Sequence, residues 1–225
     1  MSEVYVVIPA YNEGEVILQV IADLHKHNYH NIIVVNDGSD NNLEKLLRNE
    51  DVIYIKHLVN RGQGAALRTG TKLALKLGAN YIVHFDADGQ MQSQDICPML
   101  ENLKHQNIDV VLGSRFLDKT SKKRIPKFRR GILFFAKIFN RVFLRIIYTD
   151  PQNGFRVLNK NAAKVLNWKN DRMAHASEIL YLIKKHKLQY KEEKVNIQYS
   201  KYSLKKGQSG KDAFKIVWDL FINRF

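Results

Sequence analysis

The chain has 225 residues and a hydrophobic content of 45%, which allows a substantial core without disulfides or structural metals. Its single cysteine, Cys97, excludes an intramolecular disulfide and a zinc site built from four thiolates of one chain, so we expect a reducing, cytoplasmic setting. The formal net charge of +14 indicates an anionic partner, such as nucleic acid, a phospholipid surface or a phosphorylated substrate.

Strand-like and helix-like segments alternate through the first half of the chain. The predicted strands span 4–8, 32–35, 52–55 and 81–85, and the predicted helices span about 13–27, 42–49 and 63–77. This alternation predicts right-handed βαβ units, and therefore an α/β fold with a mostly parallel, Rossmann-like sheet that carries helices on both faces.

Each predicted strand is followed by a polar or glycine-containing segment. In chain order these segments read PAYNEGE, NDGSDN, HLVNRGQGA and DADGQ. Ligands of open parallel sheets collect beyond the carboxyl ends of the strands. We therefore expect the four segments to converge on one site.

The second half of the chain is more basic. Residues 116–131 are rich in cations and predict a surface loop, and residues 131–148 predict an amphipathic helix. Three cations inside that helix, Lys137, Arg141 and Arg145, argue against a membrane span and favour a helix lying in the membrane interface. Residues 200–225 end in a second amphipathic pattern. We expect a single domain over 1–225.

Asp86 and Asp88 follow a buried strand directly, separated by one alanine. Aspartates before a glycine can be ordinary turn residues. Their spacing at a strand end instead favours divalent metal binding, because Mg²⁺ and Mn²⁺ prefer hard oxygen ligands and often bridge to substrate phosphates. Gln90 offers a further amide oxygen.

Two other post-strand segments allow more than one interpretation. Asp37 either lies in a helix-entry turn with Ser39 or Asp40 as the cap, or accepts a hydrogen bond from a nucleotide base, and the local sequence does not decide between these interpretations. The glycines of NRGQGAALRTG do not form a dinucleotide or P-loop fingerprint, so the segment predicts a tight turn into a helix packed closely at Gly64 and Ala65. Arg61 is expected to point into the site.

Several cations beside glycines or loops are candidates for phosphate contacts, although most basic residues are simply solvated. They are Arg115, Arg129, Arg130, Lys205 and Lys206.

Seven motifs together resemble a known family. VVIPAYNEGE, VVNDGSDN, NRGQGAALRTG, DADGQ, GSRF, DPQNGFRVLNK and SEILYLIKKH occur in the order found in glycosyltransferase family 2, and are most similar to its dolichol-phosphate mannosyltransferase-like branch. The resemblance extends over about residues 3–210. It implies a GT-A fold and inverting transfer of a sugar from a nucleotide diphosphate donor.

The resemblance also implies roles for individual residues. The nucleoside would be held by Pro9, Tyr11, Glu13 and Asp37, and Mg²⁺ or Mn²⁺ on the diphosphate by Asp86, Asp88 and Gln90. The acceptor would be approached by Arg115, Arg129 and Arg130, with Asp150 and Glu178 as catalytic candidates at the acceptor end. A loop closing on the donor would include Lys205, Lys206 and Ser209. Where many members have two acidic residues, this chain has Asn36 and Asp37, so contact with the base would rest on Asp37.

The expected reaction is transfer of a hexose from a UDP- or GDP-sugar to a polyprenyl phosphate. The alternative is a capsular or cell-wall transferase that acts on a sugar hydroxyl of a lipid-linked glycan, with Asp150 or Glu178 as base and His175 as a weaker candidate. A nucleic-acid-binding module would explain the charge but not DADGQ, so no nucleic acid partner is expected. Many family members carry C-terminal transmembrane helices. For this chain we expect peripheral contact with an anionic membrane at its cytoplasmic face, or a separate small membrane-protein partner.

Overall fold

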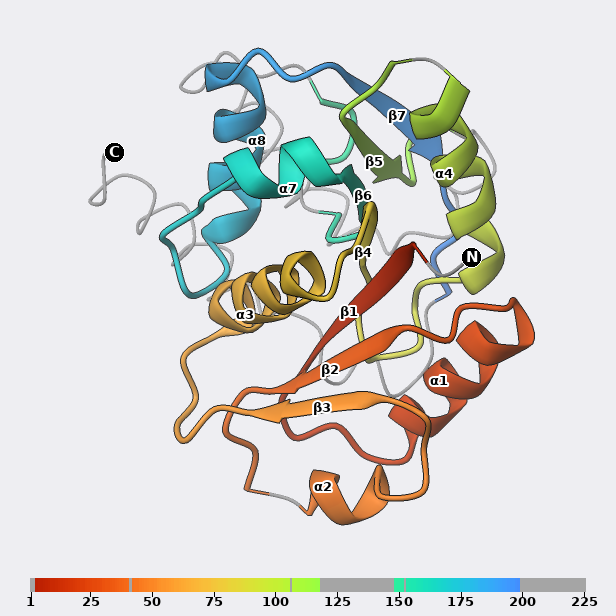
Figure 1. Ribbon diagram of the computed structural model, residues 1–225, viewed down its shortest axis with the longest axis vertical. Helices are drawn as coiled ribbons and strands as arrows, with labels where there is room; N and C mark the ends of the chain where they lie inside the picture. The colour runs from red at the N-terminus through yellow and green to blue at the C-terminus, as the bar shows by residue number, and fades with distance from the viewer. Residues whose placement is uncertain (1–2, 41, 106, 118–147, 152, 199–225) are drawn as a thin grey trace.

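The computed structural model describes residues 3–40, 42–105, 107–117, 148–151 and 153–198. Within them, seven strands form one sheet in the order β3-β2-β1-β4-β6-β5-β7 (Figure 1). The strands are β1 (Val4–Ala10), β2 (Ile32–Asn36), β3 (Ile53–Lys56), β4 (Tyr81–His84), β5 (Val110–Ser114), β6 (Arg156–Asn159) and β7 (Tyr190–Lys194). All neighbouring pairs are parallel except the two that involve β6.

Helices cover both faces of this sheet, as the βαβ pattern predicts (Figure 1). They are α1 (Val16–Lys26), α2 (Leu43–Leu46), α3 (Gln63–Lys76), α4 (Ile96–His105), α7 (Lys160–Val165) and α8 (His175–Lys185), with a 3₁₀ turn at Ser93–Asp95. Side chains of α1 and α4 form one core cluster with the sheet, and side chains of α3, α7 and α8 form the other. The four predicted strands and three predicted helices of the first half are confirmed.

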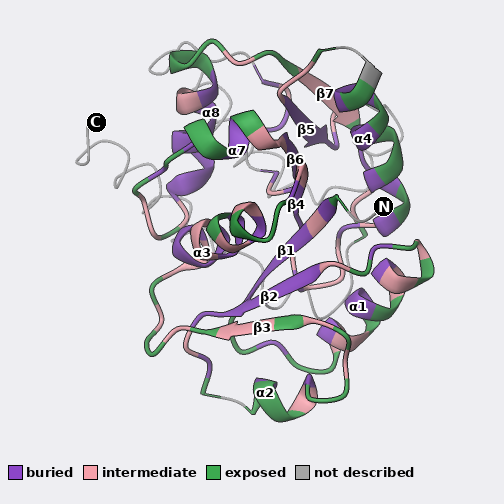
Figure 2. Cartoon of the chain, in the orientation of Figure 1, coloured by how far each residue is buried: buried purple, intermediate pink, exposed green. Residues whose placement is uncertain are grey.

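The central strands are buried on both faces, whereas the edge strands are not (Figure 2). A strand covered by helices on both sides needs a continuous apolar run, which explains VYVVI in β1 and IIVV in β2. On α1, the apolar residues Ile17, Val20, Ile21 and Leu24 recur at the spacing of one helical face and are buried. On α3, Gly70 lies so near β1 that a Cβ there would come within 2.3 Å of Val7 Cγ1.

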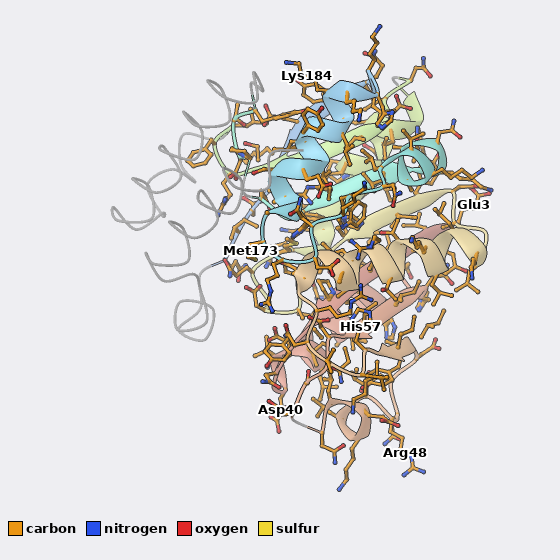
Figure 3. All side chains as sticks on the ribbon, turned by 90° about the vertical axis from the view of Figure 1, so that its left-hand side faces the viewer. Glu3, Asp40, Arg48, His57, Met173 and Lys184 are labelled. Carbon is orange, nitrogen blue, oxygen red and sulfur yellow. The ribbon has the colours of Figure 1, made fainter. Side chains whose placement is uncertain are left out.

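The chain leaves β1 toward β2 on one side and returns past β1 to β4 on the other. The loops beyond the carboxyl ends of β1 and β4 therefore diverge, and that divergence is where open α/β sheets bind ligands. Asp40, which follows β2, and Met173 lie toward one side of the molecule in Figure 3, whereas Glu3, just before β1, lies at the opposite side. The polar post-strand segments thus share one edge.

Candidate active site

Loops after the first three strands are tied together at this edge. The Asn12 amide donates to Ser39 Oγ (3.0 Å), and the Asp40 amide donates to Asn12 Oδ1 (3.0 Å). Pro9 is buried in β1, Tyr11 at its end is 40% exposed, and Glu13 is buried. The first two post-strand segments therefore converge, and the contacts of Asp37 and Asp86 described below bring in the third and the fourth.

Asp37 is buried and organises the loop that follows β3. Its Oδ1 accepts from the Arg61 amide (3.0 Å) and from His57 Nδ1 (2.7 Å), and its Oδ2 accepts from the Gly62 amide (2.6 Å). Because a carboxylate only accepts, His57 carries a proton on Nδ1, and its Nε2 forms a hydrogen bond with Thr69 Oγ1 (2.9 Å). Asp37 acts here as a loop anchor, and its contact with a base stays a prediction.

The side chain of the neighbouring Asn36 forms hydrogen bonds within the fold through both its amide nitrogen and its oxygen. Its Nδ2 donates to the Tyr54 hydroxyl (2.7 Å), and its Oδ1 accepts from the Ser39 amide (2.9 Å). This residue therefore fixes the turn in which Asp37 sits.

The glycines after β3 allow close packing between backbones. A Cβ on Gly62, whose φ is +113°, would lie 2.5 Å from the Asp171 carbonyl oxygen, and one on Gly64 would lie 2.3 Å from the Asn170 carbonyl oxygen. The Ala65 amide at the start of α3 donates to the Asp171 carbonyl oxygen (3.0 Å). The interpretation as a tight turn into a closely packed helix is confirmed, and a protein carbonyl accepts the hydrogen bond of this amide at the start of α3.

Asp86 and Asp88 lie at the end of β4. Asp86 Oδ1 accepts from Gln63 Nε2 (2.9 Å), and the backbone of Gly154 lies against its carboxylate. Burial, with Asp88 and Glu13 as neighbouring negative charges, raises the pKa of Asp86 to about 7.

Gln90 donates two hydrogen bonds to Asp88, one from its backbone N–H and one from its side chain. Its backbone amide donates to Asp88 Oδ1 (3.0 Å), and its side-chain Nε2 donates to Oδ2. The Gln90 side-chain oxygen is the end that a cation would contact.

This donor set fits Mg²⁺ or Mn²⁺. Two crowded carboxylates, one with a raised pKa, gain from a divalent cation, and the oxygen chemistry suits a hard metal. No group of three or more His, Cys, Asp or Glu side chains with metal-binding geometry occurs among the described residues. A cation here would therefore complete its coordination with substrate oxygens and water, as Mg²⁺ usually does.

A buried arginine, Arg156, interacts electrostatically with Asp86 of the site. It lies on β6 directly opposite His84 of β4, is 0% exposed, and none of its guanidinium nitrogens has a hydrogen-bond partner among the described residues. Burial lowers its pKa to about 10, and Asp86 opposes that change. Arg156 is therefore a fixed positive charge next to a cluster of carboxylates.

Arg115 and Asp150 form a buried ion pair. The Arg115 amide (3.1 Å) and Nε (2.6 Å) donate to Asp150 Oδ2, and its Nη2 donates to Oδ1 (2.7 Å). The Asp150 side chain is 0% exposed. Gly154, four residues further along, backs against Asp86, which places the pair on the same edge of the sheet.

Glu178, near the start of α8, faces the loop before that helix. Its Oε1 accepts from the Lys169 amide (2.9 Å), and its Oε2 accepts from the amide (2.8 Å) and Nδ2 (2.6 Å) of Asn170. Arg61 contributes its amide to Asp37, while its half-exposed guanidinium donates to Asp171 Oδ2 at 3.4 Å.

Some predicted site residues lie outside the described part of the chain: Arg129, Arg130, Lys205, Lys206 and Ser209. The same holds for most of 116–148 and for 200–225. In the part that is described, no helix is both long and apolar enough to cross a membrane.

Four contributors were not predicted from the sequence: Gln63, His57, Arg156 and the Arg68–Asp171 ion pair. Only Arg156 left a local signal, a cation within the apolar run GFRVLN. The others come together from separate segments, and single-sequence patterns do not show such pairings.

Comparison with known proteins decides the family. The sequence model of glycosyl transferase family 2 matches residues 5–166, which is most of the chain. The chain belongs to glycosyl transferase family 2. It is therefore a glycosyltransferase, as the motifs predicted.

Two relatives span the chain almost completely, and a third covers most of it. An uncharacterised protein of Methanocaldococcus jannaschii is 36% identical over 229 residues, covering 99% of this chain and 93% of that protein. A UDP-N-acetylglucosamine–dolichyl-phosphate N-acetylglucosaminyltransferase of Methanococcus voltae is 34% identical over 242 residues, covering 97% of this chain and 95% of that enzyme. A polyprenol monophosphomannose synthase of Mycolicibacterium smegmatis is 26% identical over 170 residues, covering 72% of this chain and 63% of that enzyme.

Solved structures confirm the GT-A fold of this family 2 glycosyltransferase. Glucosyl-3-phosphoglycerate synthase of Mycobacterium tuberculosis, crystallised with Mn²⁺, UDP and glucosyl-3-phosphoglycerate, matches with a TM-score of 0.73 at 15% identity. The match covers 97% of this chain and 77% of that one.

Proposed function

We propose that this glycosyltransferase transfers a hexose from a nucleotide diphosphate sugar to a polyprenyl phosphate, with inversion and with the help of Mg²⁺ or Mn²⁺. The single observation that carries the proposal is the Arg115–Asp150 pair, in which every oxygen of the candidate base already accepts from arginine. The other candidate bases, Glu178 and His175, are also poorly suited to take a proton.

A hydroxyl acceptor needs a base to remove its proton, and the candidates are poorly suited to that task. The Glu178 carboxylate accepts three hydrogen bonds from residues 169–170. Burial, together with Arg156, lowers the pKa of His175 to about 3, so its ring is a weak base. A phosphate acceptor is already anionic and needs no strong base. The polyprenyl phosphate acceptor is therefore favoured over the sugar hydroxyl.

On the donor side, the carboxylates Asp86 and Asp88 with the Gln90 oxygen would hold the metal. When bound, the cation supplies positive charge to the departing diphosphate. Arg156 adds a fixed positive charge beneath the same site, in surroundings where charges act more strongly than in water. Asp150 orients Arg115 toward acceptor phosphate instead of removing a proton.

Charge distribution along the sequence supports a membrane-bound acceptor. Residues 118–147 contain ten lysines and arginines and one aspartate, and residues 199–225 contain six and two. Nearly all of the +14 net charge therefore comes from these two segments, whose sequences are also amphipathic. Basic amphipathic segments bind anionic bilayers, so we propose peripheral attachment at the cytoplasmic face.

The test is a transfer assay that compares acceptors. Purified protein is given Mn²⁺, one of a panel of UDP- and GDP-sugars, and one of three acceptors in detergent: a polyprenyl phosphate, the matching polyprenol or a lipid-linked glycan. The Methanococcus voltae relative makes UDP-N-acetylglucosamine the first donor to test. We expect product from the phosphate and none from the alcohol. Transfer to the alcohol or to a lipid-linked glycan, with the phosphate inert, would overturn the assignment.

A further inference from the structure

One short turn connects the two donor-side carboxylates. The Arg61 and Gly62 amides donate to Asp37, and Gln63, the next residue, donates from its side chain to Asp86 at 2.9 Å. Residues 61–63 therefore set the relative positions of Asp37 and Asp86. Movement of this turn would disturb hydrogen bonds of both carboxylates.

A second segment, Trp168–Asp171, packs against this turn, and we call it the clasp. Trp168 Nε1 donates to the Gly64 carbonyl oxygen (2.8 Å), and the Ala65 amide donates to the Asp171 carbonyl oxygen (3.0 Å). Trp168 is almost completely buried. The backbone of the clasp approaches the turn so closely that only glycine fits opposite it.

Arg68 on the second turn of α3 adds further contacts to the clasp. Its Nη1 donates to the Trp168 (3.1 Å) and Lys169 (3.3 Å) carbonyl oxygens, and its Nη2 forms an ion pair with Asp171. Arg68, half-buried, lowers the pKa of the Asp171 carboxyl. The clasp and the first two turns of α3 thus form one hydrogen-bonded unit.

Glu178, on α8, anchors the clasp. The three hydrogen bonds to its carboxylate all come from Lys169 and Asn170, and the residue is only 6% exposed. Two of the donors are backbone amides in a segment without regular structure, and no second acceptor is recorded for either among the described residues. Removing the acceptor would leave both partly buried amides without a protein partner, which is costly.

We propose that Glu178 is a positioning residue for donor binding. It holds the clasp, the clasp holds the first turn of α3, and that turn holds Asp37 and Asp86. In this proposal Glu178 affects donor affinity and does not act as a catalytic base. The kinetic part of this inference rests on the proposed function, whereas the mechanical part does not.

Two variants test the chain of contacts from its opposite ends. Glu178→Gln puts an amide group against backbone N–H groups and loosens the clasp at its anchor. Trp168→Phe removes the hydrogen bond to Gly64 together with part of the buried ring volume, keeps an aromatic side chain, and leaves Glu178 intact. Both are expected to weaken binding of UDP or GDP with Mn²⁺ by about tenfold, measured by calorimetry, because each loosens the same turn.

Kinetics separate positioning from catalysis. Both variants should raise the donor KM about tenfold and lower kcat at saturating donor less than threefold. Their effects should be less than additive in the double variant, because they act on one unit. A loss of kcat of a hundredfold or more in Glu178→Gln, with donor affinity unchanged and Trp168→Phe silent, would establish a base and overturn the proposal. If Glu178→Gln does not fold, unchanged donor affinity in Trp168→Phe would overturn it.

Hydrogen exchange gives a readout that needs no nucleotide. The amides of Arg61, Gly62 and Ala65 should exchange at least tenfold faster in Glu178→Gln than in the wild-type protein, while those of β1 stay protected. Unchanged exchange at these amides would contradict the mechanical link. Wild-type protein that binds neither UDP nor GDP would refute the proposed function, and the exchange rates would then decide the link by themselves.

Discussion

Replacing Asp86 with asparagine should stabilise the metal-free protein at alkaline pH while removing its activity. Burial and the neighbouring carboxylates raise the pKa of Asp86 from 3.8 to about 7. Between these values the folded protein holds a proton that the unfolded chain has released. The free energy of unfolding therefore falls as pH rises from about 4 to 7, and the loss persists above pH 7.

The size of the effect follows from the two pKa values. At 1.36 kcal/mol per pKa unit, a value of about 7 in place of 3.8 corresponds to about 4 kcal/mol. The Asp86 side chain is only half-buried, and solvent and salt reduce the penalty, so we expect about 2–4 kcal/mol at pH 8. Asparagine can still accept from Gln63 and carries no charge, so the variant avoids this cost.

The assay is urea unfolding of wild-type protein and Asp86→Asn in EDTA at pH 4.5, 6 and 8. The variant should be more stable by at most about 1 kcal/mol at pH 4.5, and this difference should grow to about 2–4 kcal/mol at pH 8. Asp51→Asn, at an exposed position, is the control and should show no such divergence. A difference that does not change with pH, or an Asp86→Asn protein that is less stable at pH 8, would refute the reasoning.

Three further outcomes are expected. Gly64→Ala should destabilise the fold by about 1–3 kcal/mol in urea unfolding, because its Cβ would meet backbone at 2.3 Å, whereas Gly14→Ala, with nothing within 4 Å, should stay within about 0.5 kcal/mol. Equal losses would contradict the close packing. Buried His175 stays neutral in the folded protein at pH values where the unfolded chain takes up a proton, so the free energy of unfolding should fall as pH drops below about 6.5. His175→Gln should reduce the slope of the free energy of unfolding against pH by about 1.36 kcal/mol per pH unit. An unchanged slope would exclude this role. Membrane contact by 131–148 predicts weaker co-sedimentation with anionic liposomes when its three internal cations are neutralised, and unchanged binding would remove it. The cations to replace together are Lys137, Arg141 and Arg145.

The fold of the first half was predictable because its signals are local. Continuous apolar runs mark β1, β2 and β4, where both faces are covered, and the helical spacing on α1 marks one buried side. The second half carries weaker signals. Strand β7 reads YKEEK, which is polar, and only its place beside β5 makes it a strand.

Site chemistry was predictable where the residue type itself carries it. Asp86 and Asp88 stand out as paired charges at a strand end, and the family motifs name their neighbours. What each carboxylate contacts was not predictable. That Asp150 pairs with Arg115, 35 residues away, and that Glu178 faces Asn170 depend on how the chain folds back on itself, and nothing in either local sequence reports it.

The most direct test of the central claim is single-turnover transfer of radiolabelled N-acetylglucosamine from UDP-N-acetylglucosamine to a polyprenyl phosphate, in Mn²⁺ or in EDTA, with Asp88→Asn as the paired variant. If another donor proves active in the panel, the same comparison uses that donor. We expect labelled lipid with Mn²⁺, none in EDTA, and at least a hundredfold slower transfer by a folded Asp88→Asn protein. Full transfer in EDTA, or by Asp88→Asn, would contradict a metal-assisted reaction at the end of β4.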